Sequence, residues 1–224
     1  MSLSASGAAA PAVPRSPGRR LLDRLLARPG VGALLGLGLV VLLFAPQSPQ
    51  LLSTGGLASV LDVAAPLGIG GVAVALLLVA GQFDLSIAVV AVSSSLLTAL
   101  VVTELGLGIW PALLVSLAAA LCVGAVNGLL VVVTELPSFL VTLATFLVLQ
   151  GGSLAVATGV AGSSRVTGLA QAAGWDSALA VFGATTQLGE GRFRISLVWW
   201  VLATALTSWL LWRTRFGKIG RAHV

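Results

Sequence analysis

The polar side chains that could do chemistry in this chain are few, and the clearest group of them separates two long apolar runs. The segment Gly81–Ser86 reads GQFDLS and lies between the apolar runs 57–80 and 85–102. An ionisable residue at the edge of a membrane-spanning run is costly unless it has a partner or a task. Asp84 is therefore either the N-cap of the following helix, with Gly81 ending the preceding one, or a group on a translocation path or at a gate. The cap is the simpler interpretation, and the two roles are compatible.

Residues for covalent or metal chemistry are nearly absent from the sequence. His223 is the single histidine and Cys122 the single cysteine, so no histidine-based triad or metal site and no internal disulfide can be assembled. Cys122 lies in an apolar run, where we expect a small buried filler. The phosphate-binding pattern Gly-x-x-x-x-Gly-Lys-Ser/Thr does not occur. We therefore expect no catalysis, no cofactor and no metal in this chain.

Composition explains why chemistry is scarce. The 224 residues are 58% hydrophobic and only 8% charged, whereas a soluble domain is about 25% charged. Such a chain cannot cover itself with a water-facing surface, so it is a polytopic membrane protein in contact with lipid. The net charge of +5 does not indicate a nucleic-acid partner, because the basic residues flank apolar runs, where they set membrane orientation.

Six apolar runs predict about six transmembrane spans, and hence an all-α polytopic membrane helix bundle. The runs are residues 31–45, 57–80, 85–102, 110–133, 138–158 and 196–212. The first is short for a bilayer core of ~30 Å and must borrow flanking residues. Pro66 predicts a kink or break in the second run, because proline removes a backbone donor. Small residues at four-residue spacing predict close helix packing in the third and fourth runs. They are Ala91, Ser95 and Ala99, then Ser116, Ala120, Gly124 and Gly128.

Charges outside the runs predict the topology. We expect residues 1–30 to be a basic, disordered cytoplasmic tail, 31–212 the transmembrane domain, and 213–224 a cytoplasmic end with further basic residues. The positive-inside bias then places both ends in the cytoplasm and the long polar segment 159–195 outside. A signal peptide is the competing interpretation of the amino end, but the first run lacks a small-x-small cleavage site.

Four ordered motifs carry a resemblance to a known family. They are Gly81–Ser86, the Asn-Gly-Leu-Leu at 127–130, PSFLVTLATFLVLQGG at 137–152 and Thr-Arg-Phe-Gly at 214–217. Over roughly residues 57–218 the chain resembles the membrane permeases of bacterial ABC importers of the ribose, xylose and arabinose type. Departures include Gln82-Phe83 for Gly-Ile, and Gln150 where arginine is common.

The resemblance implies a role and a set of partners. It implies a permease subunit that forms the translocation pathway for a monosaccharide of the pentose or hexose class in the bacterial inner membrane. A solute-binding protein would deliver the sugar outside, a separate cytoplasmic ATPase would hydrolyse ATP, and a second permease copy would complete the pathway.

The motifs also nominate site residues. The candidates for the pathway are Asp84, Ser86, Asn127, Pro137, Phe139, Thr142 and Thr145, and the cytoplasmic motif is Thr214, Arg215, Phe216 and Gly217. Asn127 is either an inter-helix hydrogen-bonding group or a substrate contact. Thr142 and Thr145 either bond carbonyls of their own helix or face the pathway. In each case the structural role is the simpler interpretation.

The carboxyl end is unusual. Permeases of the resembling family continue beyond the Thr214–Gly217 motif through several more spans, so we expect this chain to be a truncated fragment. Residues 219–224 read IGRAHV, which is what one frame of a common sequencing adapter encodes. We therefore interpret 219–224 as non-native.

Two rival functions remain open. An ion-coupled secondary transporter would need an inward-facing acid with a partner deep in the bundle, whereas Asp62 and Asp84 both fall near span ends. We expect Asp62 to be a hydrated interfacial carboxylate. A membrane assembly protein without transport would not require the ordered motifs.

Overall fold

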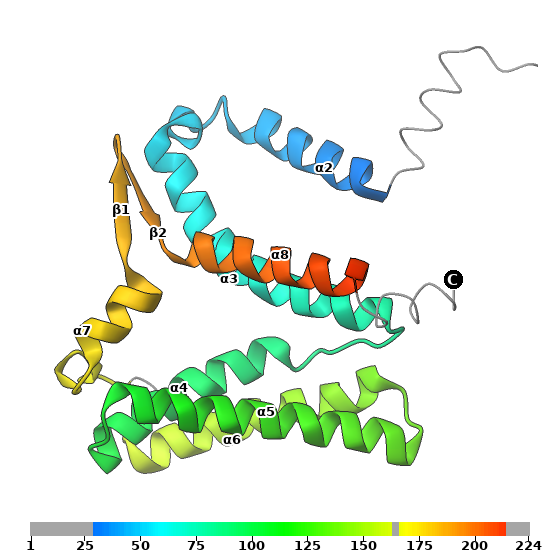
Figure 1. The fold of residues 1–224 in the computed structure, drawn as a ribbon, viewed down its shortest axis with the longest axis vertical. Coiled ribbons are helices and arrows are strands. Elements are labelled where there is room, and N and C mark those ends of the chain that lie inside the picture. Colours follow the sequence, from blue (N-terminus) through cyan, green and yellow to red (C-terminus); the bar gives the residue numbers. More distant parts are fainter. Residues whose placement is uncertain (1–28, 163–165, 214–224) are drawn as a thin grey trace, which may run out of the picture. The chain divides into compact units, whose positions relative to one another are not determined.

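The computed structural model describes residues 29–162 and 166–213, and the chain divides into two units, Met1–Ser53 and Thr54–Val224. The first unit contains helix α2 (Pro29–Phe44) and the short helix η1 (Pro49–Leu52). The second contains the long helices α3 (Thr54–Val79), α4 (Ile87–Leu105), α5 (Ile109–Thr134), α6 (Ser138–Val160) and α8 (Ser196–Arg213) (Figure 1).

The all-α membrane bundle is confirmed. Each of the six predicted runs contains a helix whose ends fall within a few residues of the expected ones. Among the described residues, α3, α4, α5 and α6 are long and apolar enough to cross a membrane. Helix α2 has 16 residues and α8 has 18 with four tryptophans, so a full count of six spans stays a prediction.

Helix α3 accommodates its proline without a break. The helix is continuous from Thr54 to Val79 across Pro66, and Figure 1 shows its ribbon changing direction along its length. It ends as Gly81 predicts. Gly81 has φ +72°, its N–H donates to Leu78 O at 3.0 Å, and the Gln82 N–H donates to Leu77 O at 2.9 Å. These two bonds form a Schellman motif, which satisfies carbonyls that the helix end leaves free.

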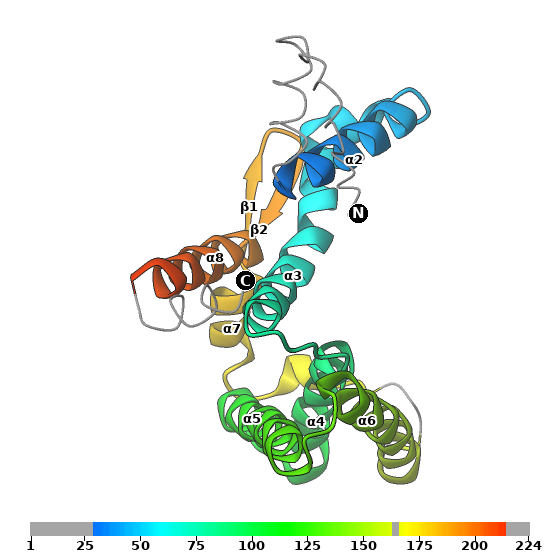
Figure 2. The ribbon, with the colours of Figure 1, turned by 90° about the vertical axis from the view of Figure 1, so that its right-hand side faces the viewer.

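Helix α4 lies between α5 and α6 (Figure 2). It contributes six buried residues, more than any other helix described. The small-residue prediction holds only in part: Ser116 and Ala99 are buried, but a side chain added at Gly124 or Gly128 would meet open space. Cys122 is exposed, so its prediction as a buried filler is wrong: it lines an open pocket between α5 and α6.

The described residues 166–195 between α6 and α8 contain secondary structure that the sequence did not predict. It contains η2 (Leu169–Gln171), α7 (Trp175–Ala178), the π-helical turn η3 (Leu179–Gly183) and the hairpin of β1 (Thr185–Leu188) and β2 (Gly191–Arg194). The strands are antiparallel, with Leu188 paired to Gly191. Gly189 has φ +60° and opens the two-residue turn, as a type II′ turn requires.

Helix α3 packs against β2 and along α8. Gly68 of α3 makes this approach possible, because a Cβ there would overlap the indole of Trp200 on α8. A second set of contacts joins η3 to α5 and α8 through rings: the Phe182 centroid lies 6.1 Å from that of Trp110 and 6.0 Å from that of Trp199. The indole N–H of Trp199 also donates to Val181 O at 2.9 Å.

Candidate functional site

The connector between α3 and α4 is held by hydroxyl groups of α6. The N–H groups of Phe83 and Leu85 in this connector have no helical partner, and within a membrane such groups must be satisfied by protein. Ser138 Oγ accepts from the Phe83 N–H at 3.0 Å, and Thr142 Oγ1 accepts from the Leu85 N–H at 3.1 Å. Two hydroxyls spaced one helical turn apart on α6 thus fix the path of the chain into α4.

Asp84 folds this connector onto the start of α4, but it is not the N-cap. The N-cap position belongs to Ser86, and Asp84 lies two residues before it. Asp84 Oδ1 accepts from the Ser86 N–H at 2.6 Å and from Ser86 Oγ at 2.7 Å, the local pattern of an Asx-turn. The capping prediction is therefore wrong in register, because the turn occupies the residues between Asp84 and the first helical residue.

A chain of side-chain hydrogen bonds continues from Ser86 into the helices. Ser86 Oγ accepts from Asn127 Nδ2 of α5 at 3.1 Å, and Asn127 Oδ1 accepts from the Thr145 hydroxyl of α6. Ser86 is 1% exposed and Asn127 5% exposed. Because buried polar groups are costly unless paired, these bonds fix α4, α5 and α6 in one register. We call Asp84, Ser86, Asn127 and Thr145 the polar network.

The threonines combine the two roles left open by the sequence. The Thr142 hydroxyl donates to Ser138 O of its own helix at 2.9 Å while accepting from the connector. The Thr145 hydroxyl lies 3.2 Å from Val141 O as well as against Asn127. Each therefore bonds its own helix and another element, and the inter-helix interpretation of Asn127 is confirmed.

The other two pathway candidates lie at the edge of this region. Pro137 is the residue before the first helical position of α6, where its missing N–H costs nothing. Phe139 is 47% exposed and belongs to no bond of the polar network. Both line an open pocket together with Gly81, Gln82 and Ser138. A neighbouring pocket of about 280 Å³ reaches Asp84, Asn127 and Thr142. The cytoplasmic motif Thr214–Gly217 lies outside the described residues.

Several polar pairs were not found by sequence reasoning. Thr98 Oγ1 donates to Ser116 Oγ at 2.7 Å between α4 and α5, and Ser93 and Ser153 share a hydrogen bond of 2.7 Å between α4 and α6. Asp62 of α3 forms an ion pair with Arg194 of β2, at 2.9 Å. The hydrated carboxylate expected at Asp62 is thus partnered. A lone acid and a loop arginine 132 positions apart in sequence carry no spacing signal that could have joined them.

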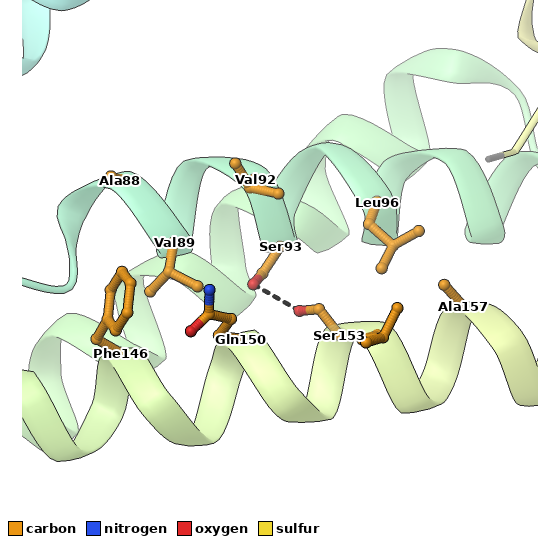
Figure 3. Close-up of a pocket in the computed structure, with 10 residues that line it drawn as sticks. Ala88, Val89, Val92, Ser93, Leu96, Phe146, Gln150, Ser153 and Ala157 are labelled. Carbon is orange, nitrogen blue, oxygen red and sulfur yellow. Dashed lines mark hydrogen bonds between the residues drawn. The ribbon is translucent and has the colours of Figure 1, made fainter. Parts of the chain in front are cut away.

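Figure 3 shows a second polar arrangement, in a groove between α4 and α6. The groove has a volume of about 370 Å³. It is lined mainly by apolar side chains, with Ser93, Gln150 and Ser153 as its polar groups. Within the described ranges, no three residues of the types His, Cys, Asp and Glu gather where they could hold a metal ion. The chemistry these surfaces can do is hydrogen bonding and solvation rather than bond making.

Apolar helices of membrane-spanning length, joined by an interior network of hydroxyl and amide groups, define a polytopic membrane protein. Residues 56–223 match the protein family described as the permease component of the branched-chain amino acid transport system. The chain therefore belongs to this family of membrane permease components, which are not themselves enzymes.

A curated relative supports the same assignment. A probable ABC transporter permease protein of Sinorhizobium fredii (strain NBRC 101917 / NGR234), y4mJ, is 39% identical over 117 residues. That match covers 52% of this chain and 34% of the relative, so the chain spans about a third of the relative's length. No solved structure matches the chain. The resemblance to ABC permeases is confirmed at the level of the family, and the ribose, xylose and arabinose subtype stays a prediction.

Proposed function

We propose that this chain is part of the membrane permease subunit of an ABC importer and contributes to the translocation pathway for a monosaccharide. The observation that carries the proposal is the family match over residues 56–223, which includes all four motifs, and the polar residues of the first three meet in one network. A cytoplasmic ATPase supplies the energy, a solute-binding protein delivers the sugar outside, and a second permease copy completes the pathway in the bacterial inner membrane.

The substrate class rests on the motifs. GQFDLS, Asn127-Gly128 and the Pro137–Gly152 segment resemble sugar permeases in order and spacing. The family description favours a second candidate, a branched-chain amino acid. The two candidates differ in charge, because an amino acid carries an ammonium and a carboxylate, and a monosaccharide carries neither.

The geometry argues against ion coupling within the described spans. Asp84 accepts hydrogen bonds from the backbone and hydroxyl of Ser86, both neutral donors. Asp62 is paired with an arginine of the hairpin. A proton- or ion-coupled carrier needs an acid that exchanges partners deep in the bundle. Neither aspartate is arranged in that way.

Uptake in membrane vesicles tests the proposal. The product of the full gene, co-expressed with a cognate ATPase and solute-binding protein, is expected to import radiolabelled ribose, xylose or arabinose only when ATP is supplied. Leucine is the matched comparison. Leucine import without sugar import would contradict the sugar assignment and support an amino acid substrate. Uptake driven by an ion gradient without ATP would contradict an ABC importer and support ion-coupled transport.

Reporter fusions test the proposed topology. A reporter after Gln187 is expected outside and one after Lys218 inside, because the basic residues of both ends are retained in the cytoplasm. Two reporters on the same side of the membrane would contradict the arrangement of spans.

A further inference from the structure

The α4–α6 groove differs from the polar network in having hydrogen-bonding groups that remain available. Figure 3 shows Val89, Ser93 and Leu96 of α4 following one another beside Phe146, Gln150 and Ser153 of α6. The lining residues recur every three or four positions on each helix, so each set occupies one helix face. The groove of about 370 Å³ lies within the range of 300–1,000 Å³ that is usual for small-molecule sites.

The polar groups of the groove have unused hydrogen-bonding capacity. Ser93 and Ser153 bond each other at 2.7 Å, and that bond uses only one of their two hydroxyl protons. Figure 3 shows the Gln150 carboxamide directed from α6 toward α4. Among the described residues no hydrogen bond to this carboxamide is found. It therefore offers two N–H donors and one carbonyl acceptor to whatever enters the groove.

The position of the groove makes that capacity significant. Both helices are long and apolar enough to cross a membrane, and a carboxamide facing lipid tails would lack any partner. Polar residues inside membrane-spanning segments generally face a water-filled cavity or another protein group. Ser93 and Ser153 partner each other, whereas the Gln150 carboxamide has no partner among the described residues, so this part of the groove is suited to a polar group rather than to acyl chains.

The absence of charge in the lining selects the class of ligand. None of the ten lining residues is ionisable. A free amino acid entering the groove would bring an ammonium and a carboxylate, each expensive to desolvate without a charged partner. A neutral polyhydroxylated solute needs only hydroxyl and amide partners, and its C–H faces can lie against apolar walls such as Val89 and Phe146.

We propose that the α4–α6 groove is a contact site for a neutral polyhydroxylated solute on the transport path, with Gln150, Ser93 and Ser153 as its hydrogen-bonding groups. This inference rests on the proposed function and assigns its substrate class to particular residues. Gln150 contributes most, because it has three free hydrogen-bonding positions where each serine has fewer.

Uptake by variants gives the first test. Gln150→Leu keeps the size of the side chain and removes its polar atoms, so sugar uptake is expected to fall about tenfold or more, as when a hydrogen-bonding site loses its partner. Ser95→Ala is the control. Ser95 lies two positions after Ser93 on α4, its hydroxyl donates to Ala91 O at 3.0 Å, and it does not line the groove. Membrane abundance is measured for both. Normal sugar uptake by Gln150→Leu would overturn the site while leaving the proposed function intact.

Cysteine labelling gives a second test that does not depend on transport. Cys122 is the single cysteine, so Cys122→Ala provides a cysteine-free background for Gln150→Cys. Val148→Cys is the control, since Val148 lies on the same helix but lines a different pocket, between α5 and α6. A small water-soluble thiol reagent is expected to label position 150, and ribose, xylose or arabinose to slow that labelling while leucine does not. No labelling at 150, slowing by leucine, or equal slowing at 148 would each overturn the proposal.

Discussion

Two groups of helices in the Thr54–Val224 unit are held together in different ways. The hydrogen-bonded group consists of α4, α5 and α6 with the 81–86 connector, and the hairpin group consists of α3, β1, β2 and α8. Each group contains one structurally important aspartate. Asp84 is paired with neutral donors beside a side chain that is 1% exposed, whereas Asp62 is paired with Arg194 where the two side chains are 33% and 55% exposed.

The difference shows how stability is distributed. In the hydrogen-bonded group several hydrogen bonds hold the helices together, and each inter-helix hydrogen bond in a membrane contributes only about 1 kcal/mol to stability. In the hairpin group the approach of α3 to α8 depends on the missing side chain at Gly68. We therefore expect the largest effect of a single substitution in the hairpin group, intermediate effects in the polar network, and the smallest effect at the exposed ion pair.

Gly68→Ala is expected to have the largest effect. The added methyl group would overlap the Trp200 ring, and overpacking of this kind costs about 1–3 kcal/mol. Gly71→Ala is the matched control, because a side chain there meets nothing within 4 Å. The free energy of unfolding in detergent micelles is the measurement. Equal stability of the two variants would contradict the close approach of α3 and α8.

Asn127→Ala is expected to cost about 1–2 kcal/mol, because it removes the inter-helix hydrogen bonds to Ser86 and Thr145 together. Thr145→Val keeps the shape of the side chain and removes only the hydrogen bond to Asn127 Oδ1, so it is expected to cost less than Asn127→Ala. The same unfolding measurement applies. An unchanged free energy of unfolding in Asn127→Ala would mean that the polar network does not hold α4, α5 and α6 together.

Two substitutions at Asp84 distinguish a structural role of its side chain from a role of its charge in transport. Asp84→Asn keeps an oxygen that can accept from the Ser86 N–H, so folded abundance is expected to stay near normal. Asp84→Ala removes the acceptor and is expected to cost about 1 kcal/mol, comparable to the loss of a helix cap. Abundance and ATP-dependent uptake are measured together. Loss of uptake by Asp84→Asn at normal abundance would show that the charge serves the transport cycle, and full activity of Asp84→Ala at normal abundance would contradict both roles.

The comparison also separates what the sequence could predict from what it could not. Hydropathy located the six long helices, because long apolar runs carry a strong signal, and Gly81 correctly marked the end of α3. The motifs named Asp84, Ser86, Asn127 and Thr145 as candidates, and the structure joins them by hydrogen bonds. The register of the cap was missed, because Asp and Ser are both good N-caps and lie two residues apart.

Other features depend on tertiary contacts that no local pattern reveals. The exposure of Cys122 depends on the open pocket that α5 and α6 leave between them. The hairpin had a weak local signal in Gly189-Glu190 between short polar strands, but the Asp62–Arg194 pair had none. The segment beyond residue 213 and the interpretation of 219–224 stay predictions.

The Asp62–Arg194 ion pair is expected to have the smallest effect. Exposed ion pairs contribute about 0.2–1 kcal/mol, because water competes for both charges. Asp62→Asn removes the charge that holds Arg194 and leaves the trypsin sites of β2 in place. The hairpin should then open more often, and trypsin should cleave after Arg192 or Arg194 in the purified protein about 1.4- to 5-fold faster, the range that this free energy implies when cleavage follows opening.

Salt supplies the control for that measurement. Raising the ionic strength screens exposed charges, with a Debye length of about 10 Å at 0.1 M and about 3 Å at 1 M. The unaltered protein should therefore approach the cleavage rate of Asp62→Asn as salt increases, while the variant changes little. Equal cleavage rates at low salt would mean that the hairpin is held to α3 by its backbone and apolar contacts alone. A difference that persisted at high salt would point to packing of the Asp62 side chain rather than to its charge.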